Sequence, residues 1–463
     1  MAPKPKIGLL PLYIALYDKV RPEARNDFEP FLRQIADGLQ GKGIDVVRSN
    51  ICCVESEFRK AVQHFETQRV DLIVTLHLAY SPSGEAIGPL CETKLPLLML
   101  DTTTDYSFGH DVEPDRLMYN HGIHGVQDLA AMFRRHGRAF HIVAGHVTES
   151  DVIGRAADFA RAALAASQFR QTKVLRIGES FEGMGDFAVE ADILRSVLGI
   201  AAEQITPSDL AEFVQRVCDD EVDDEIARDN QRFDVQASLD VHRRSVRVGL
   251  ALRACLDARA CHAFSMNFLA FDSPQPPVDT VPFLEACKAM SRGLGYAGEG
   301  DVLTASLVGA LSRSFGRTTF TEIFCPDWKG NTLFLSHMGE INPDVAASTP
   351  LLLEKSFPYT RAANPAYLAC SIQPGPAVLV NLAPGPHASF RLIVAPIHIR
   401  EDSPRKDLHT MIRAWIEPAT PVPRFLEEYS RLGGTHHSAL VLGDKAEAIQ
   451  TFASLAGIEC CTL

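Results

Sequence analysis

The stretch Val70-Asp-Leu-Ile-Val-Thr-Leu-His-Leu78 is an apolar run with the length and composition of a buried strand. It lies within a regular alternation of strand-like and helix-like segments. The strand-like segments are 7–13, 44–47, 95–100 and 139–144, and the helix-like segments are 24–41, 55–68, 124–135 and 149–167. This β-α-β-α order predicts a doubly wound parallel sheet, in which ligands bind at the carboxyl ends of the strands.

A second α/β unit is expected to follow with the same alternation. Its predicted strands are 173–177 and 261–268, and its predicted helices are 187–198, 208–218, 238–257 and 281–292. The acidic run 219–229 is interpreted as a solvated face of a helix or loop. From about residue 351, strand patterns broken by Pro and Gly predict a small antiparallel barrel or sandwich. We therefore expect two doubly wound α/β domains, residues 1–170 and 171–350, followed by an antiparallel β domain, residues 351–463.

The composition narrows the class of protein. A chain of 463 residues is too long for one core, and 46% hydrophobic with 22% charged residues is ordinary for a soluble globular protein. The net charge of −13 argues against nucleic acid or an anionic membrane as the main partner. Eleven scattered cysteines without a CxxC spacing favour reduced thiols, and no apolar run is long enough to span a membrane. We expect a cytoplasmic protein.

Five residues that could carry chemistry each stand at the end of a regular element or within a strand. Glu299 lies between two glycines, Glu322 lies in the β-prone segment 318–324, His337 follows the predicted strand 332–336, and the pair His436-His437 follows Gly-Gly-Thr. Two carboxylates and two imidazoles suit a divalent cation such as Mn²⁺, although Co²⁺ and Mg²⁺ are not distinguished. Adjacent residues on an extended chain point to opposite sides, so only one of the two adjacent histidines is expected to be a ligand.

Structural roles are the competing interpretation of several candidates. Asp301 could cap a helix while Glu299 is merely exposed, and His337 could be a hydrogen-bonded strand end. His77 ends the strand quoted above, so it could either line a cleft that binds substrate or make a structural hydrogen bond.

The motifs around these residues resemble those of one enzyme family. The most specific motifs are Gly298-Glu299-Gly300-Asp301, Lys329-Gly330-Asn331, Ser336-His337-Met338 and Gly433-Gly434-Thr435-His436-His437. Two less specific motifs precede them in the chain, Phe181-Glu-Gly-Met184 and Asn120-x-x-x-His124-Gly125. In this order they resemble the signature blocks of L-arabinose isomerase. The resemblance extends over nearly the whole chain and is most specific in its last third.

The resemblance implies a fold, a metal site and an assembly. Two α/β domains would be related to the L-fucose isomerase fold. Glu299, Glu322, His337 and His437 would hold Mn²⁺, and Glu299 and Glu322 would also be the catalytic acid and base. The substrate-binding candidates are His124, Met184, His436, Tyr13 and His77. His124 would reach the active site of a neighbouring subunit, so a homo-oligomer, trimeric or hexameric, is expected to place its active sites at subunit interfaces.

The implied activity is aldose–ketose isomerisation of an unphosphorylated sugar through an enediolate. A divalent cation on adjacent sugar oxygens would stabilise that intermediate, and a carboxylate would move the proton. Where the family has a polar turn after its first strand, this chain has Leu10-Pro-Leu-Tyr-Ile-Ala-Leu-Tyr-Asp18, so we expect a substrate other than L-arabinose. The alternatives are a metal-dependent epimerase, a lyase or glycosidase on the same scaffold, and a non-catalytic sugar-binding protein.

Overall fold

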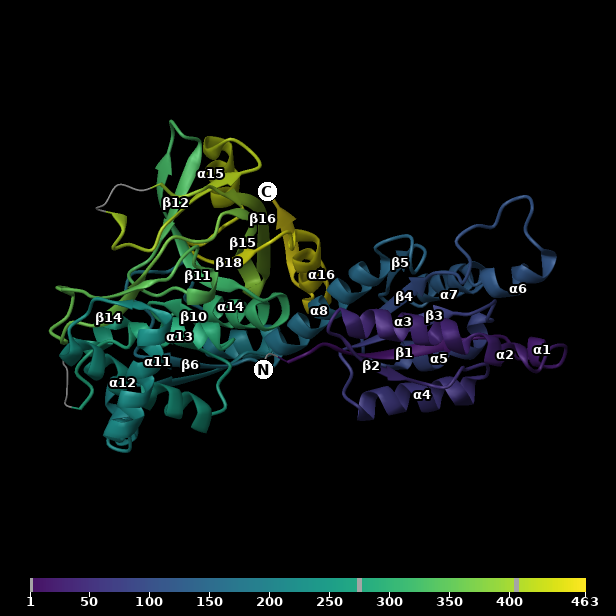
Figure 1. Ribbon diagram of the computed structural model, residues 1–463, viewed down its shortest axis with the longest axis horizontal. Coiled ribbons are helices and arrows are strands. Elements are labelled where there is room, and N and C mark those ends of the chain that lie inside the picture. The colour runs from purple at the N-terminus through teal and green to yellow at the C-terminus, as the bar shows by residue number, and fades with distance from the viewer. Residues whose placement is uncertain (1–2, 273–276, 404–407) are drawn as a thin grey trace. The chain divides into compact units, whose positions relative to one another are not determined.

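The computed structural model describes residues 3–272, 277–403 and 408–463 of the protein (Figure 1). The chain divides into two compact units, Pro3–Leu164 and Ala165–Leu463, which are considered separately. Over the described residues, no helix is both long enough and apolar enough to cross a membrane. All eleven cysteines are free, as the sequence predicts.

The first unit contains a five-stranded parallel sheet in the order β2-β1-β3-β4-β5. Its strands are β1 (Lys6–Leu12), β2 (Asp45–Arg48), β3 (Leu72–His77), β4 (Leu97–Asp101) and β5 (His141–Ala144). The main helices are α3 (Glu29–Gly41), α4 (Glu55–Thr67), α5 (Ser83–Glu92), α7 (Ile123–Arg135) and α8 (Val152–Arg170), the last of which continues into the second unit. Every residue of β3 is buried, and successive residues face opposite sides, so both faces of the sheet are covered.

The second unit begins with a four-stranded parallel sheet in the order β10-β9-β6-β7. Its strands are β6 (Lys173–Ile177), β7 (Ala201–Ile205), β9 (Ala263–Met266) and β10 (Gly295–Gly298). The long helices around it are α11 (Asp219–Arg232), α12 (Leu239–Ala258), α13 (Phe283–Ser291) and α14 (Val302–Phe315). Helix α14 is buried along most of its length because it packs against β10, β9 and β6.

The same unit also holds a mostly antiparallel seven-stranded sheet in the order β15-β18-β11-β12-β17-β16-β19. The strands are β11 (Thr318–Asp327), β12 (Thr332–Ser336), β15 (Gly375–Pro384), β16 (Phe390–Ile399), β17 (Ala414–Pro418), β18 (His437–Leu442) and β19 (Glu459–Thr462). Because β15 also pairs with β16, six of these strands form a closed ring. The expected fold class, two parallel α/β sheets and an antiparallel β barrel, is confirmed.

The strands that form the barrel are not the ones that a domain limit at residue 350 would assign to it. Strands β11 and β12, before residue 350, pair with β18 and β17 of the barrel and not with the parallel sheet. After residue 350, β13 (Leu351–Glu354) pairs with β14 (Ala366–Ala369) and with β8 (Asp234–Val235) instead of joining the barrel. The sequence of the hairpin β11–β12 predicts two paired strands but not the sheet that they join. That sheet is decided by strands distant in the chain, β18 and β17, which pair with the hairpin.

Helix α11 confirms the solvated face for most acidic residues of the run, those within 219–224, but Glu225 and Asp229 are exceptions. Glu225 and Asp229 are 5% and 2% exposed, and Lys288 Nζ lies 2.7 Å from Glu225 Oε1 and 3.0 Å from Asp229 Oδ1. Arg253 also contacts Glu225, at 2.7 Å, and His242 Nε2 lies 3.0 Å from Asp229 Oδ2. The carboxylates are buried because cations from α12 and α13 neutralise them, and these partners are 13 to 63 residues away in sequence.

Other helices are shorter than their patterns predict. Residues 24–41 form two helices, α2 (Ala24–Asp27) and α3, which meet at Phe28. Only the end of 187–198 is helical, as α9 (Ala191–Ile193) and the π-helical turn η2 (Leu194–Leu198). The start of that segment is an irregular loop, and this loop contributes to the site described next.

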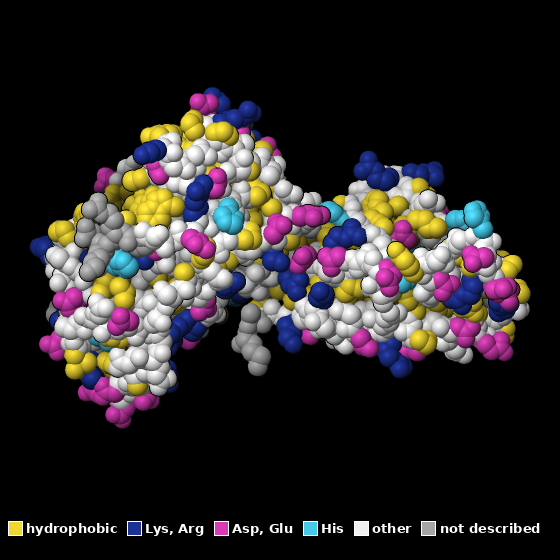
Figure 2. Space-filling model, turned by 45° about the horizontal axis from the view of Figure 1, so that its top comes forward, with side chains coloured by type: hydrophobic (Ala, Val, Ile, Leu, Met, Phe, Trp, Pro, Cys, Tyr) yellow, Lys and Arg dark blue, Asp and Glu magenta, His cyan; other side chains and the backbone are white. Residues whose placement is uncertain are grey.

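The surface carries charges of both signs. On the face shown in Figure 2, acidic and basic side chains are interspersed among apolar ones, and the basic side chains do not gather into one patch there.

Candidate metal centre

The barrel register brings the candidate residues together. Glu322 on β11 pairs directly with His437, the first residue of β18, and on its other side with Ser336, which precedes His337. Glu299 follows β10, whose end lies against β11. Three neighbouring barrel strands and one strand of the parallel sheet therefore present their side chains to one point.

The distances between the ligand atoms are short. His437 Nε2 lies 2.9 Å from Glu322 Oε1 and 3.4 Å from Glu299 Oε2. His436 Nε2 lies 3.6 Å from Glu299 Oε2 and 3.7 Å from Glu322 Oε1, and His337 Nε2 lies 3.7 Å from Glu322 Oε1. Ligand atoms about 2.0–2.2 Å from one ion are roughly 3 Å apart, so these spacings fit a shared cation. One ligand atom from each of Glu299, Glu322, His436 and His437 lies within 4.8 Å of the others.

The Nδ1 atom of each imidazole contacts a different carboxylate. His436 Nδ1 lies 2.7 Å from Asp186, His437 Nδ1 lies 2.9 Å from Asp301, and His337 Nδ1 lies 2.8 Å from Glu340. A carboxylate at Nδ1 favours a proton on that nitrogen, so each Nε2 would be available to a bound cation. All three Nε2 atoms face the two glutamates, which is the arrangement that carboxylates impose on metal-binding histidines.

Aromatic rings and glycines fix the same groups. The ring of Phe187 stacks on His437 with a centroid distance of 4.8 Å, and Phe320 meets His337 and His437 edge to face. A Cβ on Gly298 would lie 3.0 Å from the His337 ring, and one on Gly300 would lie 2.7 Å from the backbone of residues 179 and 180. The glycines on both sides of Glu299 are therefore required by close packing.

The charges of the centre favour a bound cation. Burial acts to raise the pKa of Glu299, but His436 and His437 outweigh it and lower that pKa to about 2. Burial acts to lower the pKa of His437, but Asp301, Glu299 and Glu322 raise it well above its ordinary value. The pKa of His337 is likewise raised against burial, by Glu340 and Glu322. These shifts express a local excess of carboxylates over positive charge.

Two buried atoms of the centre have no hydrogen-bond partner. They are Glu299 Oε2 and His437 Nε2, which face each other at 3.4 Å. Leaving such atoms buried and unpaired is costly, and a cation between them would satisfy both. Oxygen and neutral imidazole donors together fit a divalent ion such as Mn²⁺.

His436 does not follow the alternation expected for adjacent residues of a strand. It lies in the turn before β18, where its backbone N–H and its Nδ1 both contact Asp186 Oδ2. Its Nε2 therefore reaches the same carboxylates as His437. Sequence reasoning also missed the orienting roles of Asp186, Asp301 and Glu340. Only the spacing of His337 and Glu340, three residues apart, offered a signal for one of them.

Asp301 caps a helix, as the structural interpretation expected, and also contacts a histidine of the centre. Its Oδ1 accepts a hydrogen bond from the Thr304 N–H and caps α14, while its other oxygen contacts His437. Glu299 beside it is only 7% exposed, so the helix cap and a buried glutamate coexist.

The remaining candidates are not among the residues of this cluster. Met184 is half-buried in the loop after β6, where its N–H donates to the carbonyl of Phe181. Tyr13, His77 and His124 belong to the first unit. Tyr13 is 0% and His77 3% exposed, whereas His124 is exposed in the first turn of α7, next to the rings of Tyr80 and His121.

Three family models match the chain in sequence order. They describe the N-terminal, central and C-terminal domains of L-arabinose isomerase and match residues 25–171, 173–314 and 317–459. The third match begins next to β11, in agreement with the sheet pairing.

Curated relatives of nearly full length agree with the family match. The L-arabinose isomerase of Clostridium beijerinckii is 28% identical over 84% of this chain and 80% of its own length. That of Geobacillus kaustophilus is 27% identical over 90% of this chain and 85% of its own, and that of Mycolicibacterium smegmatis is 28% identical over 85% and 80%. The chain belongs to the L-arabinose isomerase family of sugar isomerases.

Proposed function

We propose that the protein is a divalent-metal-dependent aldose–ketose isomerase that acts through an enediolate on an unphosphorylated sugar other than L-arabinose. The observation that carries this proposal is the convergence of three imidazole Nε2 atoms and two carboxylates, with Glu299 Oε2 and His437 Nε2 buried and unpaired. Mn²⁺ suits this donor set best.

The metal-holding residues would be Glu299, Glu322, His337 and His437, with His436 as a further donor from the same side. A bound divalent ion would supply Lewis acidity toward two neighbouring sugar oxygens. Asp186, Asp301 and Glu340 contact the Nδ1 atoms and hold the rings in orientation, so that each Nε2 would be presented to the bound ion, which replaces any proton on that nitrogen.

The two glutamates are the proposed proton carriers. The pKa of Glu299 is lowered, so its carboxylate is ionised, and in this proposal that carboxylate accepts the proton that leaves C1 or C2. Glu322 lies beside it through the shared contact with His437 Nε2, so it is placed to move the hydroxyl proton. One carboxylate would take the carbon-bound proton while the other serves the neighbouring oxygen.

Charge and the first strand support the substrate class. The excess of carboxylates around the centre disfavours a phosphorylated sugar because its dianion would be repelled. The carboxyl end of β1 is Leu10-Pro-Leu-Tyr13, and these residues are buried. An apolar strand end in place of the family's polar turn supports a substrate other than L-arabinose.

A homo-oligomer with shared active sites is part of the proposal. His124 is exposed near the carboxyl edge of the first sheet, where it could contribute to a site on a neighbouring subunit. Mixing inactive His124→Ala chains with inactive Glu299→Gln chains should then restore activity, because some sites combine two intact halves. Failure of the mixed, assembled protein to recover activity would contradict sharing of the site.

The decisive experiment for the function is hydrogen exchange at the sugar. Purified Mn²⁺-loaded protein is incubated in D₂O with a panel of aldoses and ketoses, and the products are followed by NMR. An isomerase gives deuterium at C1 or C2 together with aldose–ketose conversion. Exchange with inversion at C2 and no ketose would indicate an epimerase, bond cleavage a lyase or glycosidase, and binding without exchange a non-catalytic protein. Any of these three results would overturn the proposal.

A further inference from the structure

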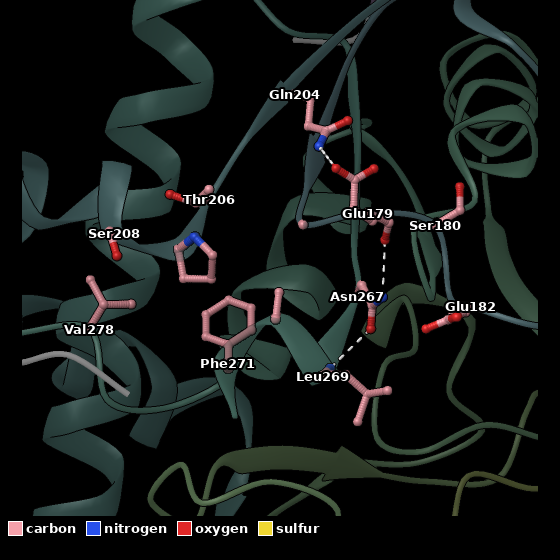
Figure 3. Close-up of a pocket in the computed structure, with 13 residues that line it drawn as sticks. Glu179, Ser180, Glu182, Gln204, Thr206, Ser208, Asn267, Leu269, Phe271 and Val278 are labelled. Atoms are coloured by element: carbon pink, nitrogen blue, oxygen red, sulfur yellow. Dashed lines mark hydrogen bonds between the residues drawn. The ribbon is translucent and has the colours of Figure 1, made fainter. Parts of the chain in front are cut away.

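A separate pocket lies at the carboxyl end of the second parallel sheet. It has a volume of about 550 Å³ and is lined by Gly178, Glu179, Ser180, Glu182, Gln204, Thr206, Pro207, Ser208, Asn267, Leu269, Ala270, Phe271 and Val278. Figure 3 shows these residues and the hydrogen bonds among them. None of the proposed metal-holding residues lines it.

The position of the pocket follows from the strand order. In the order β10-β9-β6-β7, the chain leaves β6 toward β7 on one side and leaves β9 toward β10 on the other. The loops that follow β6 and β9 therefore diverge, and such a point in a parallel sheet is where a crevice for ligands opens. The pocket is lined by the loop segments 178–182, after β6, and 267–271, after β9.

Polar side chains of the pocket hold one another in place through hydrogen bonds. The Asn267 side chain, 7% exposed, donates to the carbonyl oxygen of Glu179 at 3.0 Å and accepts from the Leu269 N–H at 3.0 Å. Gln204 donates to the Glu179 carboxylate (Figure 3). Gln204 in turn accepts a hydrogen bond from Arg176. The two amides and the Glu179 carboxylate are thus fixed by hydrogen bonds that join β7 to the loops after β6 and β9, and a ligand would meet a wall that is already ordered.

The chemistry of the lining selects a class of ligand. Two carboxylates, two amides and three hydroxyls face a wall that contains Leu269, Phe271 and Val278, and the lining includes no Lys or Arg. Such a wall repels anions, while carboxylates and amides bind hydroxyl groups from several directions. Apolar and aromatic side chains accept the C–H faces of a ring or chain.

We propose that this pocket is a second binding site, distinct from the metal centre, for an uncharged polyhydroxylated molecule such as a sugar or sugar alcohol. This inference goes beyond the proposed isomerase activity and does not depend on it.

The loop 178–187 joins the pocket to the metal centre. Its first residues line the pocket, and the Phe181 N–H donates to the Glu299 carbonyl at 2.9 Å. Farther along, Asp186 holds His436 and Phe187 stacks on His437. A ligand that contacts residues 178–182 adds restraints to this loop, so binding in the pocket is communicated to the residues around the metal.

Binding tests use the full-length Mn²⁺-loaded protein with ribitol, myo-inositol and D-glucose as probes, measured by calorimetry. A parallel arm uses protein stripped with EDTA, in which probes that require the metal no longer bind. Ser208 is exposed on the pocket wall, so Ser208→Trp fills the pocket at little cost to folding. We expect binding of at least one probe to survive EDTA and to weaken at least tenfold in Ser208→Trp.

Two further variants keep the test informative. Ser348→Trp places the same side chain at an exposed serine outside the pocket and should bind like the unaltered protein. Leu269→Ser removes part of the apolar wall at a side chain that is already 39% exposed, and it should weaken binding at least threefold. Hydrogen–deuterium exchange of residues 178–187 should slow on binding, and this protection should be lost in Ser208→Trp.

Three results would overturn the inference. The first is equal affinity of the unaltered protein and Ser208→Trp for every probe. The second is complete loss of probe binding on EDTA treatment, which would assign all binding to the metal centre. The third is binding at the Ser208-sensitive site of the cation ethanolamine but of none of the polyols, which would make it a cation site. In each case the isomerase proposal would stand unchanged.

Discussion

Glu299 has a backbone conformation that residues other than glycine seldom adopt. Its φ is 63°, in the left-handed region, and its carboxylate is 7% exposed with Oε2 unpaired. Such a conformation in a residue other than glycine costs about 1–3 kcal/mol and persists where the surroundings enforce it. Here the close packing of Gly298 and Gly300 enforces it and aims the side chain at the three imidazoles.

Removing the charge of Glu299 should abolish turnover while the fold survives. Glu299→Gln keeps the shape of the side chain but loses both the base and a ligand charge, so kcat should fall about 10³-fold or more. The rate of sugar conversion is measured alongside circular dichroism. The exposed Glu447→Gln is the matched control and should retain activity. Near-normal activity of Glu299→Gln would remove this residue from the mechanism.

Asp186 is expected to act through His436 and not on the sugar. Asp186→Asn weakens its hold on the Nδ1 proton, so Mn²⁺ affinity should fall about 10- to 100-fold while excess Mn²⁺ restores much of the activity. Calorimetric titration with Mn²⁺ measures the affinity, and Glu190→Gln, in the same connection and exposed, is the control. Unchanged Mn²⁺ affinity would show that His436 is not a ligand.

His77 should make the stability of the protein depend on pH. Burial lowers its pKa from 6.5 to about 3, and both of its ring nitrogens lack a hydrogen-bond partner. Unfolded His77 takes a proton below about pH 6.5 and the folded form does not, so stability is full above 6.5 and falls as the pH drops toward 3. Between pH 6.5 and 5 the loss is about 2 kcal/mol.

A leucine at this position should remove that slope. The unfolding free energy in urea is measured at pH 7.5 and 5.0, and His77→Leu should lose less stability on acidification than the unaltered protein. His64→Leu, at an exposed histidine, should leave the slope as it was. An identical slope in all three proteins would mean that His77 is protonated in the folded state.

At the scale of elements, helix α11 shows how one cation supports a buried acidic face. Burial would raise the pKa of Glu225, but Arg253 and Lys288 outweigh it and hold that pKa well below its usual range. Lys288 reaches from α13 to both Glu225 and Asp229, and its side chain is only 6% exposed. The packing of α11 against α12 and α13 therefore depends on this pairing.

Lys288→Met should destabilise the protein by about 3–5 kcal/mol because the buried Asp229 loses its lysine and the buried Glu225 loses one of its cations. Arg228 offers a matched comparison, since it contacts the same Glu225 from a position that is 68% exposed. Arg228→Met should cost about 1 kcal/mol or less. Urea unfolding of both variants measures the difference, and equal losses would show that burial does not govern the strength of these pairs.

At the scale of the whole molecule, all the proposed metal-holding residues lie in one unit. Glu299, Glu322, His337, His436 and His437 belong to the unit Ala165–Leu463, and the other unit, Pro3–Leu164, contributes none of them. A ligand stabilises the structure that binds it by about 2.7 kcal/mol at 100 times its Kd. A cation should therefore act on the two units unequally.

Removal of the metal should loosen only the second unit. After EDTA treatment, hydrogen–deuterium exchange should rise in β11, β18 and the loop 178–187 and stay unchanged in β1, β3 and β4. Mn²⁺ should reverse the effect, and Glu322→Gln should blunt it. Equal changes in both units would indicate a global effect of the chelator and no site at these residues.

Much of the fold could be predicted because it depends on short-range pattern. The apolar runs of β3 and β4, and the helical spacing of α4 and α7, are properties of about ten neighbouring residues each. The ligand candidates Glu299, Glu322, His337 and His437 were visible because carboxylates and histidines at the ends of strands are conspicuous and because their motifs resemble a known family.

What only the tertiary structure decided depends on partners distant in the chain. The pairing of β11 with β18 placed Glu322 beside His437, and the turn before β18 aimed His436 at the same point. Asp186 reaches His436 across 250 residues, and Lys288 neutralises Asp229 across 59. Local sequence sets which conformation a segment prefers, but burial of charge and convergence of ligands are set by whatever the folded chain brings alongside.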